Sequence, residues 1–395
     1  MRFSPLVDRI AGEGAAAWEL HARAKAASER DPSVIVMSVG DPDLETPDIV
    51  KEAAIRAIRE NDTHYTTIAG VPPLREAVAR RFSESTGREW TASQVMITPG
   101  TQSALFFSSL CLAGPGDEII APEPMYVTYE ATVRVTGASL VRTPQPAETG
   151  FRPSLDAMAA AVTPRTRAIL ITTPNNPTGV ALSRAELEAI ADLARTHDLW
   201  VISDEVYGLT LFDREHVSIA SLPGMAERTV SVGGLSKSHA MTGWRIGWAI
   251  APEALIAHFD NLGLCMLYGL PGFTQAAGVA ALTSGPEGAW EAADAMRDIY
   301  QRRCRIALAA LNQAPGLRCV EPEGGMFALL DVRGTGLSAR DFANRLFEAE
   351  KVSVLDATAF GPSAAGHVRL SFAIEDAELT EACRRIARFA ASAGE

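Results

Sequence analysis

The apolar run AILIT at residues 168–172 leads directly into the polar turn TPNNPTG at residues 173–179. Ser183 and Glu186 follow, and together they form the capping-box signature of a helix start. A second apolar run, LWVIS at residues 199–203, comes after that predicted helix. Short apolar runs that alternate with helices are typical of a parallel sheet covered on both faces. The segment therefore predicts a strand–helix–strand unit of an α/β fold.

The same alternation extends in both directions, from about residue 46 to residue 250. A helix is predicted to start with Thr46 as its cap and Pro47 in its first turn. Further buried strands are predicted at Gln94–Thr98, Asp117–Ala121, Thr229–Val232 and Arg245–Ile250. We therefore expect a large α/β domain with a largely parallel sheet over residues 46–275.

The remaining sequence predicts a second, smaller domain. A helical pattern dominates after residue 275, and two strand-like runs follow at Met326–Val332 and His367–Ala373. This mixture predicts an α+β domain formed by residues 276–395 together with residues 1–45.

Composition narrows the class of protein. The chain has 395 residues and a net charge of −12, which argues against binding nucleic acid or an anionic membrane surface. No apolar segment approaches the roughly 18 residues of a membrane span. The five cysteines are scattered and odd in number, so we interpret them as reduced thiols of a cytoplasmic protein.

Polar groups follow the predicted strands one after another. Ligands of open α/β sheets bind beyond the carboxyl ends of the strands, so these groups are candidates for one site. Lys237 is conspicuous because the chain has only four lysines and this one lies among small, weakly polar residues. The candidates are Gly100-Thr101-Gln102 at a helix start, Asn175–Gly179, Asp204–Tyr207, Lys237 and Arg245.

Each of these groups alone has an ordinary explanation. Gly100-Thr101-Gln102 could simply cap a helix, the Asn-Pro-Thr-Gly segment could be a turn, and Asp204 could be a solvated loop acid. Their shared position favours one site that combines a binding place for an anion, an amine that can react with an aldehyde, a carboxylate, a phenol and an amide. The seven histidines lack metal-ligand spacing, and His239 is interpreted as structural, so no metal site is predicted.

These motifs, in this order, resemble those of the pyridoxal-phosphate aminotransferases of classes I and II, the fold type I enzymes. The resemblance runs from about residue 30 to the C-terminus, where HVRL at residues 367–370 completes it. It implies a mostly parallel seven-stranded sheet in the large domain and a homodimer with shared active sites. It also implies pyridoxal 5′-phosphate as the cofactor, and a small-molecule amino acid and 2-oxo acid as the substrates.

The resemblance implies three catalytic residues. Lys237 would hold the cofactor as a Schiff base and then move the substrate's Cα proton. Asp204 would keep the pyridine nitrogen protonated, and Tyr207, with Asn176, would hydrogen-bond the ring oxygen. Tyr126 would stack on the ring.

It also implies the groups that hold the two anions. The cofactor phosphate would be bound by Gly100, Thr101, Gln102, Ser236 and Arg245, and by Tyr65 of the partner subunit. The substrate carboxylate would be bound by Arg369, a bidentate role that lysine could not reproduce, with Asn176 and the backbone of Gly40 beside it.

Further stretches, among them residues 38–43, 123–130 and 264–269, resemble family members that act on arginine and pyruvate. A basic donor would need an acidic or carbonyl-rich pocket for its distal cation. The sequence does not choose among five acids near the substrate loops: Asp41, Asp43, Glu45, Glu130 and Asp356.

Several alternatives remain open at this point. The enzyme could use aspartate, aromatic or a broad range of donors, or it could be a carbon–sulfur lyase on the same fold. Gly334–Ala339 weakly resembles a dinucleotide loop and would indicate an oxidoreductase. A transcription regulator on this fold would carry an added DNA-binding domain, for which the acidic chain is too short.

Overall fold

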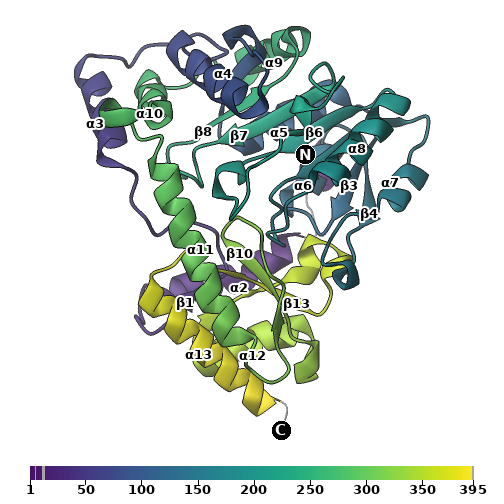
Figure 1. Ribbon diagram of the computed structural model, residues 1–395, viewed down its shortest axis with the longest axis vertical. Helices are drawn as coiled ribbons and strands as arrows, with labels where there is room; N and C mark the ends of the chain where they lie inside the picture. The colour runs from purple at the N-terminus through teal and green to yellow at the C-terminus, as the bar shows by residue number, and fades with distance from the viewer. Residues whose placement is uncertain (5, 11–13, 394–395) are drawn as a thin grey trace.

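A computed structural model describes residues 1–4, 6–10 and 14–393 of the protein. Figure 1 shows a seven-stranded sheet with its helices in the upper part of the molecule and a smaller sheet with α2, α12 and α13 in the lower part. The long helix α11 (Ala292–Leu311) runs from one part into the other. None of the described helices is long and apolar enough to cross a membrane.

The large sheet has the strand order β2-β8-β7-β6-β5-β3-β4. Its strands pair in parallel except for β8, which is antiparallel to both of its neighbours. The fold class predicted from the sequence is thereby confirmed. The strands are β2 (Val95–Pro99), β3 (Glu118–Glu123), β4 (Ser139–Pro144), β5 (Thr166–Thr172), β6 (Trp200–Asp204), β7 (Thr229–Gly234) and β8 (Ile246–Ile250).

Helices cover both faces of this sheet. Side chains that alternate along β5 and β6 belong to two different cores, so Leu170 and Ile202 pack on one face while Ile169 and Val201 pack on the other. The first face is covered by α5 (Thr101–Leu112), α6 (Thr128–Arg134) and α9 (Glu253–Met266), and the second by α7 (Leu155–Ala160) and α8 (Arg184–Thr196). A third core joins β2 and β8 to α3 (Asp48–Arg59), α4 (Pro72–Thr86) and α10 (Gly272–Leu282).

The two helix starts predicted from the sequence have different outcomes. The capping box is present, because Ser183 Oγ accepts from the backbone N–H of Glu186 and the Glu186 carboxylate accepts from the N–H of Ser183. The predicted cap Thr46 is wrong, since α3 begins at Asp48 after Pro47. Thr46 Oγ1 instead donates to the carbonyl of Ala240 at 2.6 Å, so it fixes the loop that follows Lys237.

The smaller sheet is antiparallel, with the order β12-β13-β10-β9. Gly334 lies in a 3-10 turn after β10 of this sheet, so the dinucleotide-loop alternative lacks the parallel strand unit that it requires. The elements are β9 (Arg318–Cys319), β10 (Phe327–Asp331), β12 (Leu355–Asp356) and β13 (His367–Ser371), with α2 (Gly14–Ser28), α12 (Ala339–Glu350), α13 (Asp376–Ala393) and the parallel pair β1 (Ile35–Val36) and β11 (Val352–Ser353).

The first helix, α1 (Leu6–Ile10), lies away from this smaller sheet. It contacts α6 of the large sheet, and the N-terminus in Figure 1 is drawn over the upper part of the molecule. The start of the chain therefore differs from the prediction that all of the first forty-odd residues pack with the smaller domain. Short 3-10 turns occupy Ala92–Gln94, Ala147–Thr149, Gly208–Thr210, Ile219–Ser221, Gly285–Glu287, Arg333–Thr335, Ala357–Phe360 and Pro362–Ala364.

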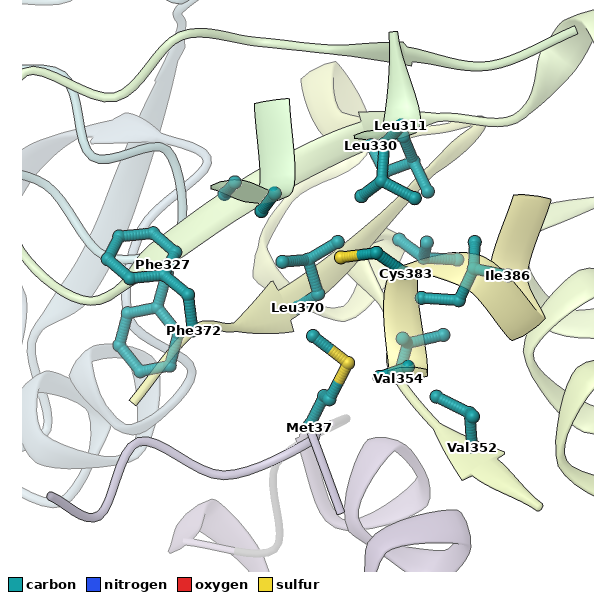
Figure 2. Packing of buried hydrophobic residues seen from close by; sticks show 14 of the residues in the cluster. Met37, Leu311, Phe327, Leu330, Val352, Val354, Leu370, Phe372, Cys383 and Ile386 are labelled. Atoms are coloured by element: carbon teal, nitrogen blue, oxygen red, sulfur yellow. The ribbon is translucent and has the colours of Figure 1, made fainter. Parts of the chain in front are cut away.

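Figure 2 shows how the smaller part of the molecule is held together. Met37, Leu370 and Cys383 meet in one buried cluster although they come from the two ends of the chain. The backbone of Met37 bridges two strands, since its N–H donates to Ser353 at 3.0 Å and its carbonyl accepts from Ser371 at 2.8 Å. Apolar burial and these two hydrogen bonds fix the segment after Met37 beside β13.

A buried ion pair fixes the same segment further along. The guanidinium of Arg303, on α11, donates to both carboxylate oxygens of Asp43 at 2.6 and 2.8 Å. It also donates from Nε to Asp376, at the start of α13, at 2.9 Å. A bidentate pair of this kind fixes orientation as well as distance. Residues 38–43 are therefore held at both ends.

Candidate active site

The predicted site residues meet at the carboxyl edge of the large sheet. Gly100, Asp204 and Lys237 follow β2, β6 and β7, while Arg245 immediately precedes β8, whose reversed direction places its start at this edge. A cavity of about 590 Å³ opens there, which lies in the usual range for small-molecule sites. It is lined by Gly40, Thr101, Gln102, Tyr126, Asn176, Asp204, Tyr207, Ser236, Lys237, Arg245 and Arg369.

Lys237 places its amine inside this cavity. Its Nζ donates to the carbonyl of Gly40 at 2.7 Å. Burial lowers the pKa of Lys237 to about 8; the carboxylate of Asp41 opposes this shift, and the cations Arg369 and Arg245 add to it. Roughly a tenth of this amine is therefore unprotonated at pH 7, far more than for an ordinary lysine, and the unprotonated form is the one that a nucleophile or proton acceptor requires.

Asp204 lies at the end of β6 and is fully enclosed. Its Oδ2 accepts from the hydroxyl of Tyr129 at 2.7 Å, and its Oδ1 accepts from the N–H of Val206 at 3.1 Å. Burial nevertheless raises the pKa of Asp204 to about 6, against these two hydrogen bonds. A cationic group placed against it would be strongly favoured, because the buried carboxylate forms no ion pair within the described part of the chain.

Tyr129 is a site residue that the sequence reasoning did not single out. It is buried, and its hydroxyl joins Asp204 to Thr172 Oγ1, which lies 2.7 Å away at the end of β5. Its ring packs edge-on against Tyr126. The only sequence signal was its place within the stretch EPMYVTYE at residues 123–130, which supports the family resemblance.

Arg369 presents a buried cation to the cavity. Its guanidinium donates to Asn176 Oδ1 at 3.0 Å and to the carbonyl of Ser38 at 2.8 Å, and it lies over the rings of Phe327 and Phe360. Its Nε has no hydrogen-bond partner, and burial lowers its pKa to about 10. A buried guanidinium without a carboxylate is costly unless an anion binds to it. The environment of Arg369 therefore favours an anionic group at this place in the cavity.

The start of α5 lies at the same cavity. Thr101 and Gln102, in its first turn, line the cavity together with Arg245, whose guanidinium lies close to Gly100. Gly100 has φ +81°, a conformation that other residues rarely adopt, and a Cβ there would also displace the guanidinium of Arg245. Helix N–H groups, the helix dipole and an arginine together favour a phosphate.

Two predicted residues lie outside the lining of this cavity. Gly100 does not line the cavity. Because it has no side chain, the guanidinium of Arg245 can lie against its backbone. Tyr65 is 85% exposed, packs edge-on against Tyr268 and is not part of the cavity lining. Further lining residues that the sequence reasoning did not predict are Trp18, Val39, Leu105, Thr128, Thr172, Val206, Thr242, Gly243 and Phe327.

The cavity brings together an amine, a buried carboxylate and two guanidinium groups at the carboxyl edge of an α/β sheet. The comparison with protein families agrees: the chain belongs to the aminotransferases of class I and II, whose family model matches residues 32–386. The protein is accordingly an aminotransferase, and enzymes of these classes depend on pyridoxal 5′-phosphate.

Individual relatives cover nearly the whole chain. It is 51% identical to the arginine–pyruvate transaminase of Pseudomonas aeruginosa over 391 residues, which are 99% of this chain and 98% of that protein. It is 38% identical to aromatic-amino-acid aminotransferase 2 of Thermococcus litoralis over 89% of this chain and 90% of that protein. The solved aspartate aminotransferase of Thermus thermophilus with maleate superimposes with a TM-score of 0.91 at 36% identity, covering 98% and 100% of the two chains.

Asp204→Asn should stabilise the cofactor-free protein while removing most of its activity. The pKa of Asp204 is raised in the fold, so the folded state loses stability as pH rises from about 4 to about 6 and does not regain it above. Removing the charge should therefore raise the free energy of unfolding by about 2 kcal/mol at pH 8, and by less at pH 5. Urea unfolding of the cofactor-free protein at both pH values measures this, with the exposed Glu215→Gln as a control. An equal effect at pH 5 and pH 8 would contradict the assignment.

The amine of Lys237 in the cofactor-free protein should react with added pyridoxal 5′-phosphate at a rate that rises with a midpoint near pH 8. Only the unprotonated amine reacts, and burial lowers the pKa of Lys237 from 10.5 to about 8. Absorbance changes recorded between pH 6 and pH 10 give the midpoint. Lys237→Ala should leave only the slow reaction of the exposed lysines, and a midpoint near 10.5 in the unmodified protein would rule out the lowered pKa.

Proposed function

We propose that this protein transfers the amino group of L-arginine, or of another basic L-amino acid, to pyruvate or a similar 2-oxo acid. The observation that carries the proposal is the buried guanidinium of Arg369, without a carboxylate partner, in the same cavity as the amine of Lys237. Such a cavity accepts an α-carboxylate and places the rest of an amino acid beside an amine. The 51% identity to a relative named for arginine and pyruvate supports this choice of substrates.

The donor set of the cavity fits pyridoxal 5′-phosphate. When bound, the cofactor supplies an aldehyde to which amines attach and a ring that accepts the electrons of the broken Cα–H bond. The α5 N-terminus, Ser236 and Arg245 would hold its phosphate, and Asp204 would face its ring nitrogen. The phosphate and the protonated ring nitrogen of the cofactor would then each lie beside a group of opposite charge.

Two tyrosines support the proposed ring site: Tyr129 contacts the carboxylate of Asp204, and Tyr207 offers a hydroxyl for the ring oxygen. Tyr129 donates to Asp204, which fixes the orientation of the carboxylate and supports its ionised form. Burial raises the pKa of Tyr207, so its hydroxyl keeps its proton and acts as a donor in the cavity. We propose that Tyr207 and Asn176 bind the ring oxygen and that Tyr126 covers the ring face.

Lys237 would carry the proton that leaves the Cα atom of the donor. Its lowered pKa lets it accept a proton near neutral pH, and its position beside the Gly40 carbonyl holds Nζ in place through a hydrogen bond of 2.7 Å. Arg369 would bind the donor carboxylate and keep the Cα–H bond within reach of Nζ. Positioning of this kind lowers the entropic part of the barrier.

The charges of the cavity favour a basic donor over a dicarboxylate. The basic residues that line it, counted over the described residues, are Lys237, Arg245 and Arg369. All three have proposed roles with the cofactor or the α-carboxylate, so none remains for a second carboxylate of aspartate or glutamate. Aspartate, aromatic or broad-range use is the alternative, while no feature of the cavity specifically favours a carbon–sulfur lyase.

We also propose that the protein acts as a homodimer with shared sites. Tyr65 and Tyr268 pack together on the surface, and the neighbouring side chains of α9, Leu264 and Met266, are about half exposed. Large apolar side chains gathered in this way are typical of an interface. A second copy would cover them and could bring Tyr65 of the partner subunit to the phosphate.

The division into domains follows the buried cores. Three of the cores lie within residues 50–289, and the largest remaining core joins residues 20–37 to residues 296–390 with two side chains of the large part, Tyr207 and Phe212. We propose the division expected from the sequence, residues 46–275 against residues 276–395 with 1–45, with two changes: the large domain extends to about residue 289, and α1 belongs to it because it contacts α6. Residues 5, 11–13 and 394–395 lie outside the described structure.

A donor screen tests the proposed function. With pyruvate as the acceptor, we expect arginine, lysine or ornithine to exceed aspartate and phenylalanine in kcat/KM by about 10-fold or more, a difference that a charge-selective pocket supplies. Alanine formation and the matching 2-oxo acid are measured, and Lys237→Ala should form neither. Preference for aspartate or phenylalanine would overturn the donor class, and release of ammonia and pyruvate from cystathionine without transamination would overturn the reaction type.

Arg369→Lys should weaken binding of both the amino acid and the 2-oxo acid. Lysine keeps the charge but cannot form the bidentate contact with a carboxylate, which should cost about 2–4 kcal/mol of binding free energy for each substrate. Steady-state KM values for donor and acceptor measure the change, and Arg340→Lys, on the exposed side of α12, should alter neither. Unchanged KM values in Arg369→Lys would show that the carboxylate binds elsewhere.

A further inference from the structure

The structure distinguishes among the five acids that the sequence leaves as candidates to bind the distal cation of a basic donor. Two of them belong to ion pairs outside the cavity. Asp43 is held by both nitrogens of the Arg303 fork, at 2.6 and 2.8 Å. Glu45 accepts from Lys51 Nζ at 3.0 Å on an exposed surface. Their charges are already matched, and neither lines the cavity.

Two more acids are also engaged elsewhere. Glu130 accepts from Arg142 at 2.8 Å and from Arg134 at 3.3 Å. Asp356 caps the turn that follows it by accepting from the N–H of Thr358 at 3.0 Å, and its other oxygen lies 3.7 Å from Arg340. Neither of these acids lines the cavity.

Asp41 differs from these four acids. It lines the cavity together with Lys237 and Trp18. Its Oδ1 accepts a hydrogen bond of 2.7 Å from the neutral hydroxyl of Thr242, and no ion pair joins it to a basic side chain in residues 1–4, 6–10 and 14–393. Its negative charge raises the pKa of Lys237, the neighbouring amine in the cavity lining.

The backbone around Asp41 places it at a suitable distance from the carboxylate site. The carbonyl of Ser38 contacts Arg369, the carbonyl of Gly40 contacts Lys237, and the side chain of Asp41 reaches Thr242. Three residues of extended chain span at most about 10 Å. An extended arginine spans roughly 6 Å from Cα to the guanidinium carbon, given bonds of about 1.5 Å. With its carboxylate carbon and a hydrogen-bond distance of about 3 Å at each end, a donor anchored at Arg369 covers roughly 13 Å, enough to present its cation to the far end of this segment.

We propose that Asp41 determines the specificity for basic donors, with its carboxylate receiving the guanidinium or ammonium group of the donor side chain. Trp18, on the cavity wall, supplies an aromatic surface against which a guanidinium packs well. This inference rests on the proposed function, because it assigns a residue to the donor class proposed there.

Asp41→Asn tests the assignment, because asparagine keeps the size of the side chain and an oxygen for Thr242 but loses the charge. The paired donors are arginine and citrulline, which have nearly the same shape and differ in charge. We expect Asp41→Asn to lower kcat/KM for arginine by about 10- to 100-fold, mainly through KM, and to change the value for citrulline by less than about 3-fold. Glu45→Gln, four positions along the same segment, should leave both donors unchanged.

An equilibrium measurement accompanies the kinetics. The inhibitor 5-guanidinopentanoate has the carboxylate and guanidinium of arginine but no α-amino group, so it binds without reacting. Its inhibition constant should rise by about 10-fold or more in Asp41→Asn, while that of hexanoate should not change.

Equal losses for arginine and citrulline would overturn the proposal, because they would show that Asp41 acts through Lys237 or Thr242. Unchanged kinetics for arginine in Asp41→Asn would overturn it as well, while leaving the proposed donor class intact. Failure of the unmodified enzyme to use any basic donor is seen without a variant and would overturn the donor class itself.

Discussion

The active site depends on one unfavourable burial, that of the Arg369 guanidinium. The fold encloses this cation between two phenylalanine rings and gives it an amide and a backbone carbonyl, but no carboxylate. The cost of desolvating the charge is offset only in part by these contacts. A substrate that brings its own carboxylate completes the arrangement, so binding energy is available at the place where an amino acid must be oriented.

The same cation influences the chemistry at Lys237. Arg369 and Arg245 add to the effect of burial in lowering the pKa of the amine, and Asp41 limits that effect. Asp204 shows the opposite behaviour on the other side of the cavity, where burial raises the pKa of a carboxylate. Burial in the same cavity therefore makes the Lys237 amine a weaker base and the Asp204 carboxyl a weaker acid. Opposite shifts of this kind suit a site proposed to bind a cationic ring and to move a proton.

Much of this arrangement was predictable because the signals are local. The buried runs that became β5, β6 and β7 are short and continuous, and the polar residues that follow them had to lie at one edge of the sheet. The edge strand β4 was missed because only one of its six residues is buried, so it lacks a continuous apolar run. Thr46 was misplaced because its hydroxyl bonds to Ala240, 194 residues away, in preference to its own helix. Tyr129 and Arg303 could not be assigned for the same reason, since their partners Asp204 and Asp43 lie 75 and 260 positions from them in sequence.

The distance in sequence between Ser38 and Arg369, 331 residues, has a consequence for how the site matures during synthesis. The large sheet is complete once β8 has emerged, and every group proposed for the cofactor within one subunit lies before residue 251. The arginine proposed to anchor the carboxylate arrives only with the last strand, β13. A nascent chain that has folded its first sheet thus has the groups proposed for the cofactor while it still lacks the one proposed for the amino acid, and on this proposal turnover requires that β13 has been made.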